Sequence, residues 1–182
     1  GGGGADFLNG NLGSVSIHGG GGEDTLAGEG GADTLDGGAG ADTFVVGAGA
    51  SDAGPLGVFV GEIVDHIVGW TSADRIDKPG AALPPPGVPG GDPSHYYELS
   101  PATNEADADY YGPFGPPLPY DYWRARDECF RLMADNPTLD VIAVESDNDV
   151  LVFIDADGGD APDLAIRLVG VGLGDIGFGN FI

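Results

Sequence analysis

The sequence predicts a fold dominated by β-structure: a parallel β-roll, followed by a β-rich C-terminal part with one α-helix and a long proline-rich loop. Three features predict it: a period of nine in residues 1–45, many prolines and tyrosines in residues 79–119, and three apolar segments between polar turns in residues 140–169. We expect the roll to span residues 1–54. A capping domain would then span residues 55–182, with residues 79–119 inserted as a loop.

The chain is strongly acidic, with 30 acidic and 6 basic residues among 182 and a net charge of −24. Electrostatic repulsion excludes nucleic acids and anionic membrane surfaces as partners. Membrane insertion is excluded too, because no apolar segment approaches the roughly 20 residues that span a bilayer. The single cysteine, Cys129, permits no internal disulfide, so we expect bound metal ions to supply rigidity instead.

Five consecutive nonapeptides fill residues 1–45 without an insertion: GGGGADFLN, GNLGSVSIH, GGGGEDTLA, GEGGADTLD and GGAGADTFV. The eighth place is always apolar, and the sixth place is aspartate in every repeat except the second, which has Val15. Glycines in the first, second and fourth places permit tight turns with positive φ. The last residues predict a short strand whose apolar side chain points inward. A flexible glycine-rich linker, the alternative, would not keep both columns in phase.

Two repeats are expected to form one coil, so that turns two repeats apart stack at about 4.8 Å. Stacked carboxylates and turn carbonyls would form cages of oxygen ligands. Such cages suit Ca²⁺ better than Mg²⁺, because Ca²⁺ accepts six to eight oxygens in flexible geometry. One edge of the roll would hold Asp6, Asp24 and Asp42, and the other edge would hold Val15, Asp33 and Ser51.

The pattern GGxGxDxUx of these repeats resembles the RTX, or haemolysin-type, calcium-binding repeats. In that family each Ca²⁺ lies between stacked turns and is held by turn carbonyls and two aspartates. The resemblance implies one site between Asp6 and Asp24 and another between Asp24 and Asp42. The implied carbonyl ligands are those of Gly1, Gly3, Gly20 and Gly22 at the first site, and of Gly19, Gly21, Gly38 and Gly40 at the second.

The other edge departs from the family pattern. Val15 cannot ligate, so we expect the site between the second and fourth repeats to be weak or empty. Asp33 would need other ligands, since Ser51 stands where the pattern has aspartate. The implied helpers are the carbonyls of Gly28, Gly30, Gly47 and Gly49.

Residues 58–78 predict a strand, a turn and a second short strand. They resemble the segment that closes the roll in serralysin-type proteases and other RTX proteins, with Asp65 and Asp77 at its acidic positions. Asp65 would complete a terminal calcium site, or it is an ordinary turn carboxylate. In residues 79–119 the prolines exclude a helix or a central strand, and the tyrosines either anchor this loop or face a partner.

A helix is expected from about Asp121 to Ala134, with Trp123, Phe130 and Met133 on its core face. Strands are expected at Asp140–Val144, Val150–Ile154 and Leu164–Val169. The turn between the last two, Asp155–Asp163, is dense in carboxylates. It either binds Ca²⁺ or is a plain turn, because it lacks the EF-hand layout.

No catalytic motif is present: there is no HExxH, and His18, His66 and His95 are scattered. We therefore expect no catalysis from this chain. Leu173–Ile182 resembles the C-terminal region of RTX proteins exported by type I secretion. That resemblance implies a secreted bacterial protein, extracellular or on the cell surface, whose partners are calcium ions and the type I secretion apparatus. The chain opens inside a repeat without Met or signal peptide, so we expect it to be a fragment.

Three functions fit these features. The first is a calcium-dependent folding and secretion module, unfolded in the low-calcium cytosol and folded outside the cell. The second is the tail of a secreted enzyme, such as a serralysin-like metalloprotease or a polysaccharide-modifying enzyme. The third is a surface-layer or adhesion component that self-assembles through calcium or the proline- and tyrosine-rich loop.

Overall fold

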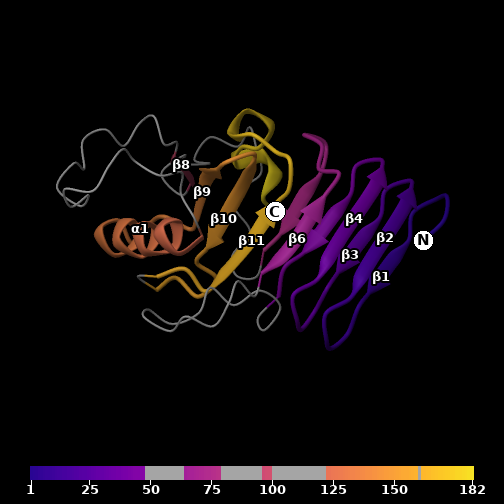
Figure 1. Cartoon of the computed structure of the whole chain (residues 1–182), viewed down its shortest axis with the longest axis horizontal. Helices are drawn as coiled ribbons and strands as arrows, with labels where there is room; N and C mark the ends of the chain where they lie inside the picture. The colour runs from indigo at the N-terminus through magenta and orange to yellow at the C-terminus, as the bar shows by residue number, and fades with distance from the viewer. Residues whose placement is uncertain (48–63, 79–95, 100–121, 160) are drawn as a thin grey trace.

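The computed structural model describes residues 1–47, 64–78, 96–99, 122–159 and 161–182. The coiled repeats lie at one end of the molecule, with the N-terminus at their outer edge, and the C-terminal strands continue the same stack (Figure 1). The single α-helix of the described residues lies at the opposite end (Figure 1). Strands predominate, as the sequence predicts.

The two-repeat coil is confirmed. The first, third and fifth repeats supply β1 (Phe7–Asn9), β3 (Thr25–Ala27) and β5 (Thr43–Val45), and the second and fourth supply β2 (Ser16–Gly21) and β4 (Thr34–Ala39). Strands two repeats apart pair in parallel, so each apolar eighth residue lies opposite its counterpart on the next coil. The apolar side chains at the eighth place become more buried along the chain, and those of Leu26, Leu35 and Phe44 are at most 1% exposed.

A further coil follows the repeats. β6 (Asp65–Val68) pairs in parallel with β4, and β7 (Arg75–Asp77) pairs in parallel with β5. The predicted strand, turn and second strand are thus confirmed for residues 64–78, whereas residues 58–63 lie outside the described residues. Ile67 and Ile76 extend the two apolar columns of the repeats, opposite Leu35 and Phe44.

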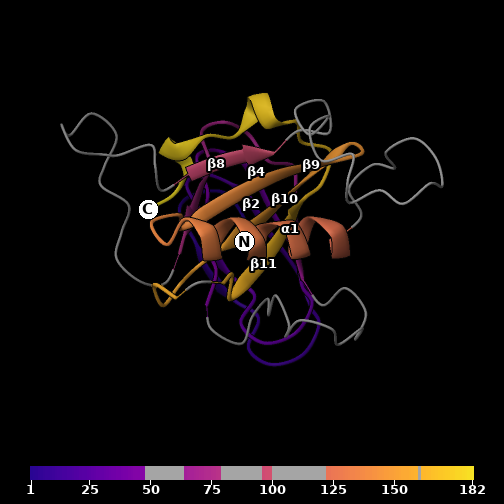
Figure 2. The same cartoon turned by 90° about the vertical axis from the view of Figure 1, so that its left-hand side faces the viewer.

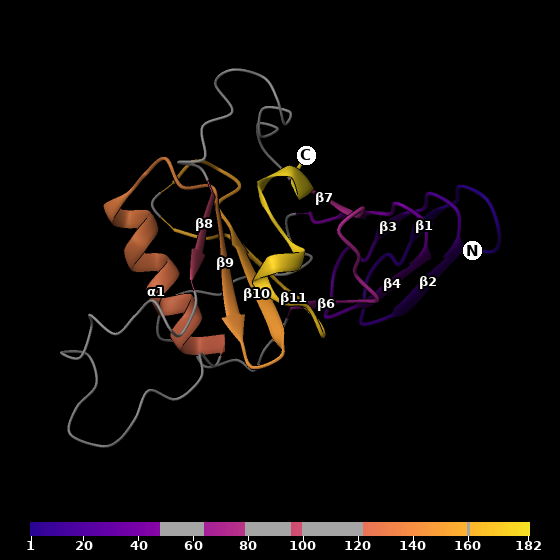
Figure 3. The ribbon, with the colours of Figure 1, turned by 90° about the horizontal axis from the view of Figure 1, so that it is seen from above.

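The remaining strands extend one face of the roll. β8 (Tyr96–Leu99), β9 (Val141–Ser146), β10 (Asp149–Ile154) and β11 (Leu164–Leu168) complete a seven-stranded sheet of order β2-β4-β6-β11-β10-β9-β8. The other sheet has four strands, β1-β3-β5-β7. The larger sheet runs without a break from the repeats to β8 (Figure 3). The division into two domains at residues 54 and 55 remains a prediction.

The larger sheet is buried on both faces beyond β6, because alternate residues of β9 and β10 enter two different clusters. Val141, Ala143 and Val152 pack toward the roll and the four-stranded sheet. Ile142 and Phe153 pack on the other face, against the helix α1 (Tyr122–Asp135). Figure 2 shows α1 lying across these strands.

The helix lies one residue later than predicted, and its core face differs. Ala125, Cys129 and Met133 are 0% exposed, four residues apart on one face. Met133 was predicted to be in the core, but Phe130 is only half-buried, and the side chain of Trp123 lies outside the described residues. The face that packs against β9 and β10 thus follows the spacing of four residues from Ala125 to Met133, and Phe130 lies at its margin.

Most of residues 79–119 lies outside the described residues, so the predicted loop is tested only at β8. There Tyr96 is half-buried and its ring lies 5.7 Å from that of Phe181, whereas Tyr97 is exposed. Anchoring is therefore observed for Tyr96. β8 pairs in parallel with β9 at the edge of the sheet, which is compatible with nearby prolines.

Candidate metal sites

Four aspartates stack along one edge of the roll; we call them the odd ladder. The backbone N–H of each of the first three donates to the carboxylate of the next coil: Asp6 to Asp24 Oδ1 (2.8 Å), Asp24 to Asp42 Oδ1 (2.9 Å) and Asp42 to Asp74 Oδ1 (2.9 Å). The predicted pairs Asp6–Asp24 and Asp24–Asp42 are therefore neighbours. The fourth member, Asp74, was not among the predicted site residues.

The opposite edge holds the even ladder, Val15, Asp33 and Asp65. Val15 N–H donates to Asp33 Oδ1 (2.8 Å), and Asp33 N–H donates to Asp65 Oδ1 (2.9 Å). The expectation that Ser51 follows Asp33 was wrong: β6 pairs with β4, and this pairing brings Asp65 into the column. Ser51 and Gly49 lie outside the described residues. Asp65 is thus a ladder residue and not an ordinary solvated turn carboxylate.

The period of nine does not give the register of the last coil, because an insertion interrupts the phase of the repeats. Successive ladder residues are 18 positions apart in the repeats but 32 apart at the last coil, so 14 residues are inserted there. The sequence nevertheless contains the spacing of the repeats here: Asp65 and Asp74 are nine residues apart. Each stands two residues before an isoleucine, just as the aspartate of a repeat stands two residues before its apolar eighth residue. Asp77, matched by resemblance to an acidic position, lies outside the ladder and is exposed on β7.

The ladder carboxylates are buried, except that of Asp6, which is half-buried, and two of their oxygens lack any hydrogen-bond partner. Asp24, Asp33, Asp42 and Asp65 are each 1% exposed. Oδ2 of Asp24 and Oδ2 of Asp33 are buried without a donor. A buried carboxylate without a partner is strongly unfavourable. These two oxygens therefore fit a cation, one at each edge of the roll.

The glycines of the turns leave the room that such a cation requires. A Cβ on Gly19 would lie 2.5 Å from both Asp24 Oδ2 and the Gly37 carbonyl oxygen, and Cβ atoms on Gly1 and Gly28 would overlap the carboxylates of Asp6 and Asp33. Four more predicted ligands have positive φ, and a Cβ on each of them would overlap a carbonyl oxygen of the preceding coil. These are Gly20, Gly22, Gly38 and Gly40.

The remaining predicted glycines lie in the same turns. Gly3 bridges to Gly21, whose carbonyl accepts a hydrogen bond from Gly4 N–H. The Gly30 carbonyl accepts from Gly13 N–H. The structure thus gathers all fifteen predicted site residues at the two edges of the roll, and the carbonyls of Gly21 and Gly30 additionally tie neighbouring coils together.

Burial raises the pKa of Asp42 above its ordinary value of 3.8. The hydrogen bond from Asp24 N–H opposes this shift, while the charges of Asp74, Asp24 and Asp36 add to it. The odd ladder is therefore electrostatically unfavourable without a counter-ion. A divalent cation would reverse the sign of the local field and favour the ionised carboxylates.

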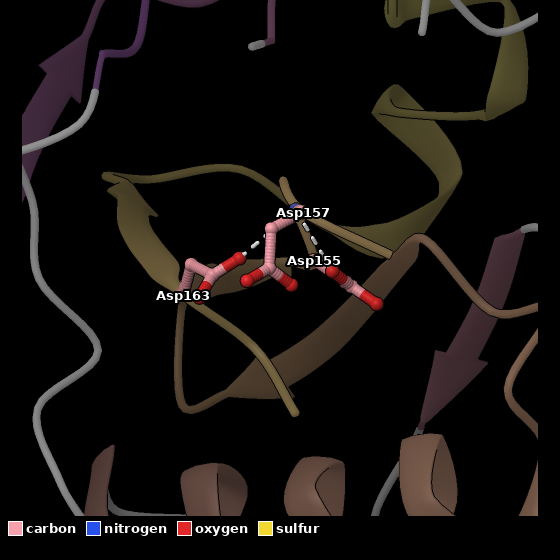
Figure 4. A group of neighbouring side chains, drawn as sticks. All are labelled: Asp155, Asp157 and Asp163. Atoms are coloured by element: carbon pink, nitrogen blue, oxygen red, sulfur yellow. Dashed lines mark hydrogen bonds between the residues drawn. The ribbon is translucent and has the colours of Figure 1, made fainter. Parts of the chain in front are cut away.

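A second acidic group lies in the turn between β10 and β11. One carboxylate oxygen from each of Asp155, Asp157 and Asp163 lies within 4.8 Å of the other two. Figure 4 shows these three side chains grouped in the turn. Asp155 Oδ1 accepts from the N–H groups of Asp157, Gly158 and Gly159, and Asp163 Oδ2 accepts from Ala156 N–H and Asp157 N–H. Burial raises the pKa of Asp155, and these backbone donors oppose the shift. Backbone N–H groups thus supply hydrogen bonds to these carboxylates, and the calcium site and the plain turn both stay predictions for this segment.

The other candidate reactive groups are dispersed. His18 is exposed and lies 2.9 Å from Asp36 Oδ2 on the neighbouring strand. Cys129 is buried under α1, where burial raises the pKa of its thiol. Within the described residues, only the acidic turn brings three or more metal-ligating side chains close enough together to hold one ion. The ladders need turn carbonyls as well.

The match to a family of known repeats agrees with this geometry. Residues 1–35 and 18–51 match the family described as RTX calcium-binding nonapeptide repeat (4 copies). No curated protein matches the chain. A solved structure, the AlgE6R3 subunit from the Azotobacter vinelandii mannuronan C5-epimerase, is similar over 99% of this chain and 78% of that one, at 24% identity and a TM-score of 0.33. The nonapeptides of residues 1–51 are thus RTX calcium-binding repeats.

Proposed function

We propose that the chain is the calcium-dependent folding module of a secreted bacterial RTX protein. Its acidic repeats remain unfolded at the low calcium concentration of the cytosol and fold when Ca²⁺ binds outside the cell. Residues 173–182 contain the type I secretion signal, which the resemblance of this segment to exported RTX proteins supports. No catalytic activity is proposed for the chain itself.

The unpartnered oxygens of Asp24 and Asp33 are the main support for this proposal. Each buried charge costs several kcal/mol if no partner compensates it. The outer coil contributes little apolar burial in return, since Leu8 and Ile17 are only half-buried. Each interior glycine adds roughly 0.5–1 kcal/mol of entropic cost relative to alanine. The outer coils therefore depend on a ligand that binds only the folded state.

Calcium supplies the missing free energy by mass action. Binding at one hundred times the dissociation constant stabilises the folded state by about 2.7 kcal/mol for each ion. Several sites along the two ladders would together exceed the stability of many small domains. Within the described residues no helix combines the length and apolar character needed to cross a bilayer.

The proposal is tested by titrating the full chain with Ca²⁺ and following β-structure by far-UV circular dichroism, with Mg²⁺ as the ion control. Asp24→Asn removes the carboxylate shared by two sites of the odd ladder. Asp77→Asn is the matched variant, because it removes one charge from an exposed position on β7 outside the ladders.

We expect a cooperative gain of β signal with Ca²⁺ alone. Asp24→Asn should shift the midpoint to at least tenfold higher calcium, and Asp77→Asn should leave it nearly unchanged. Wild-type chain that is equally folded in chelator would contradict the proposal. Equal shifts in both variants would show that Ca²⁺ acts on overall charge and not at the ladder.

A further inference from the structure

The last turn of the odd ladder, residues 69–74, is built differently from the turns before it. In the third and fifth repeats the second and fourth places are glycines with positive φ, such as Gly38 and Gly40. The corresponding places of the last turn hold Trp70 and Ser72, which do not have positive φ. This turn closes on itself instead: Asp74 N–H donates to the Thr71 carbonyl at 3.0 Å.

The carboxylate of Asp74 is fully supplied with protein donors. Asp42 N–H donates to its Oδ1 at 2.9 Å, and Thr71 N–H donates to its Oδ2 at 2.7 Å. Asp24 is equally buried but receives a donor only at Oδ1, and its Oδ2 has none. Hydrogen bonds to an ionised carboxylate are stronger than neutral ones. The charge of Asp74 is thus stabilised without an ion.

The carbonyls of the last turn are also occupied. Asn180 Nδ2 donates to the Asp74 carbonyl at 2.8 Å and to the Ser72 carbonyl at 3.2 Å. Asn180 Oδ1 accepts from Gly177 N–H at 2.9 Å, which fixes the orientation of the amide. The Ser72 carbonyl stands at the fourth place of its turn, where the carbonyls of Gly22 and Gly40 are implied cation ligands in the earlier coils. The Asp74 carbonyl stands where those of Asp24 and Asp42 accept a backbone N–H from the next coil.

Asn180 reaches this position because residues 173–182, which we call the closing tail, pack along β7. Phe181 is 2% exposed and bridges to Ile76. Ile182 N–H donates to the Ile76 carbonyl at 2.9 Å, and Lys78 N–H donates to the Ile182 carbonyl at 3.1 Å. Trp70 Nε1 donates to the Asp175 carbonyl at 3.1 Å. Contacts on both sides therefore hold the tail against the last turn.

We propose that hydrogen-bond donors of the protein close the odd ladder in place of a cation, with Thr71 N–H bound to the last carboxylate and Asn180 Nδ2 bound to the last turn carbonyls. Asn180 is a positioning residue: it orders the turn on which the calcium-binding coils stack. The inference rests on the proposed function for those coils. It predicts that the cation requirement of the odd ladder ends before Asp74.

The experiment uses the full chain and two readouts, the number of bound Ca²⁺ ions by calorimetry and hydrogen exchange of residues 69–78 with calcium or chelator. The variants are Asn180→Ala, Asp74→Asn and Asp24→Asn. Asn136→Ala is the matched control, because Asn136 Nδ2 also donates to a backbone carbonyl, that of Leu132 at 3.0 Å, away from the roll.

Asn180→Ala should leave the number of bound ions unchanged and should speed exchange in residues 69–78 by about 5- to 30-fold, in chelator as well as in calcium. Asp74→Asn should also keep the number of ions. Asp24→Asn should lose bound calcium, and Asn136→Ala should affect neither readout.

Loss of a bound ion in Asp74→Asn or Asn180→Ala would overturn the inference, since the last turn would then hold a cation. Protection of residues 69–78 that appears only with calcium would overturn it too. Wild-type chain that binds no calcium would instead contradict the proposed function, so the two failures are distinguishable.

Discussion

Replacing Val15 with aspartate should create a calcium site on the even ladder. Val15 already has the geometry of a ladder residue, because its N–H donates to Asp33 Oδ1 at 2.8 Å, as Asp24 N–H donates to Asp42 Oδ1 at 2.9 Å. A Cβ on Gly10 would lie 2.6 Å from Val15 Cγ2 and 2.8 Å from the Gly28 carbonyl. The new carboxylate would therefore occupy the same place beside the turn as that of Asp24 beside Gly19.

The expected change in folding stability of Val15→Asp has two parts of opposite sign. In chelator, Val15→Asp loses about 1 kcal/mol of apolar burial, since the side chain is half-buried, and adds a charge near Asp33. In calcium at about one hundred times the dissociation constant, one more ion contributes about 2.7 kcal/mol. The variant should thus be less stable than wild type in chelator and about 1–2 kcal/mol more stable in saturating calcium.

Calorimetry should count one more bound ion in Val15→Asp, and thermal unfolding at several calcium concentrations should show the crossover in stability. Val15→Ala is the control for lost packing, and it should be destabilised equally with and without calcium. If Val15→Asp binds as many ions as wild type and never regains stability in calcium, the ladder geometry does not define the calcium sites.

Three further predictions follow from burial and backbone conformation. Gly40→Ala should prevent folding of the coils, because the φ of Gly40 is +145° and a Cβ would overlap the Gly22 carbonyl. Gly174→Ala is the control: its Cβ would meet nothing within 4 Å, so the calcium midpoint should change little. In calcium-stripped protein, the coils should gain stability, seen as β signal in far-UV circular dichroism, as the pH falls through the raised pKa of Asp42 toward 3.8, because the native state takes up the proton first. Met133→Ala should cost about 2–5 kcal/mol in urea unfolding, with or without calcium, because the side chain is fully buried under α1.

The odd ladder and the apolar columns were predictable because their information is local and periodic. A residue type recurring every nine positions fixes both the coil and the stacking of Asp6, Asp24 and Asp42. The same reasoning failed at Asp33, where 14 inserted residues displaced the next coil and Asp65 replaced the expected Ser51. Periodicity cannot continue through an insertion of unknown length. Only strand pairing shows where the coil resumes.

The sequence by itself determined the repeat, its calcium chemistry and the approximate positions of α1, β9, β10 and β11. Tertiary structure alone decided how the roll ends. Asn180 contacts Asp74 across 106 residues of chain, and no pattern within either segment predicts that contact. The physical reason is that the repeats specify their neighbours through short, regular spacing. The closing contacts depend on where the larger sheet places the tail, which is set by the packing of the whole core.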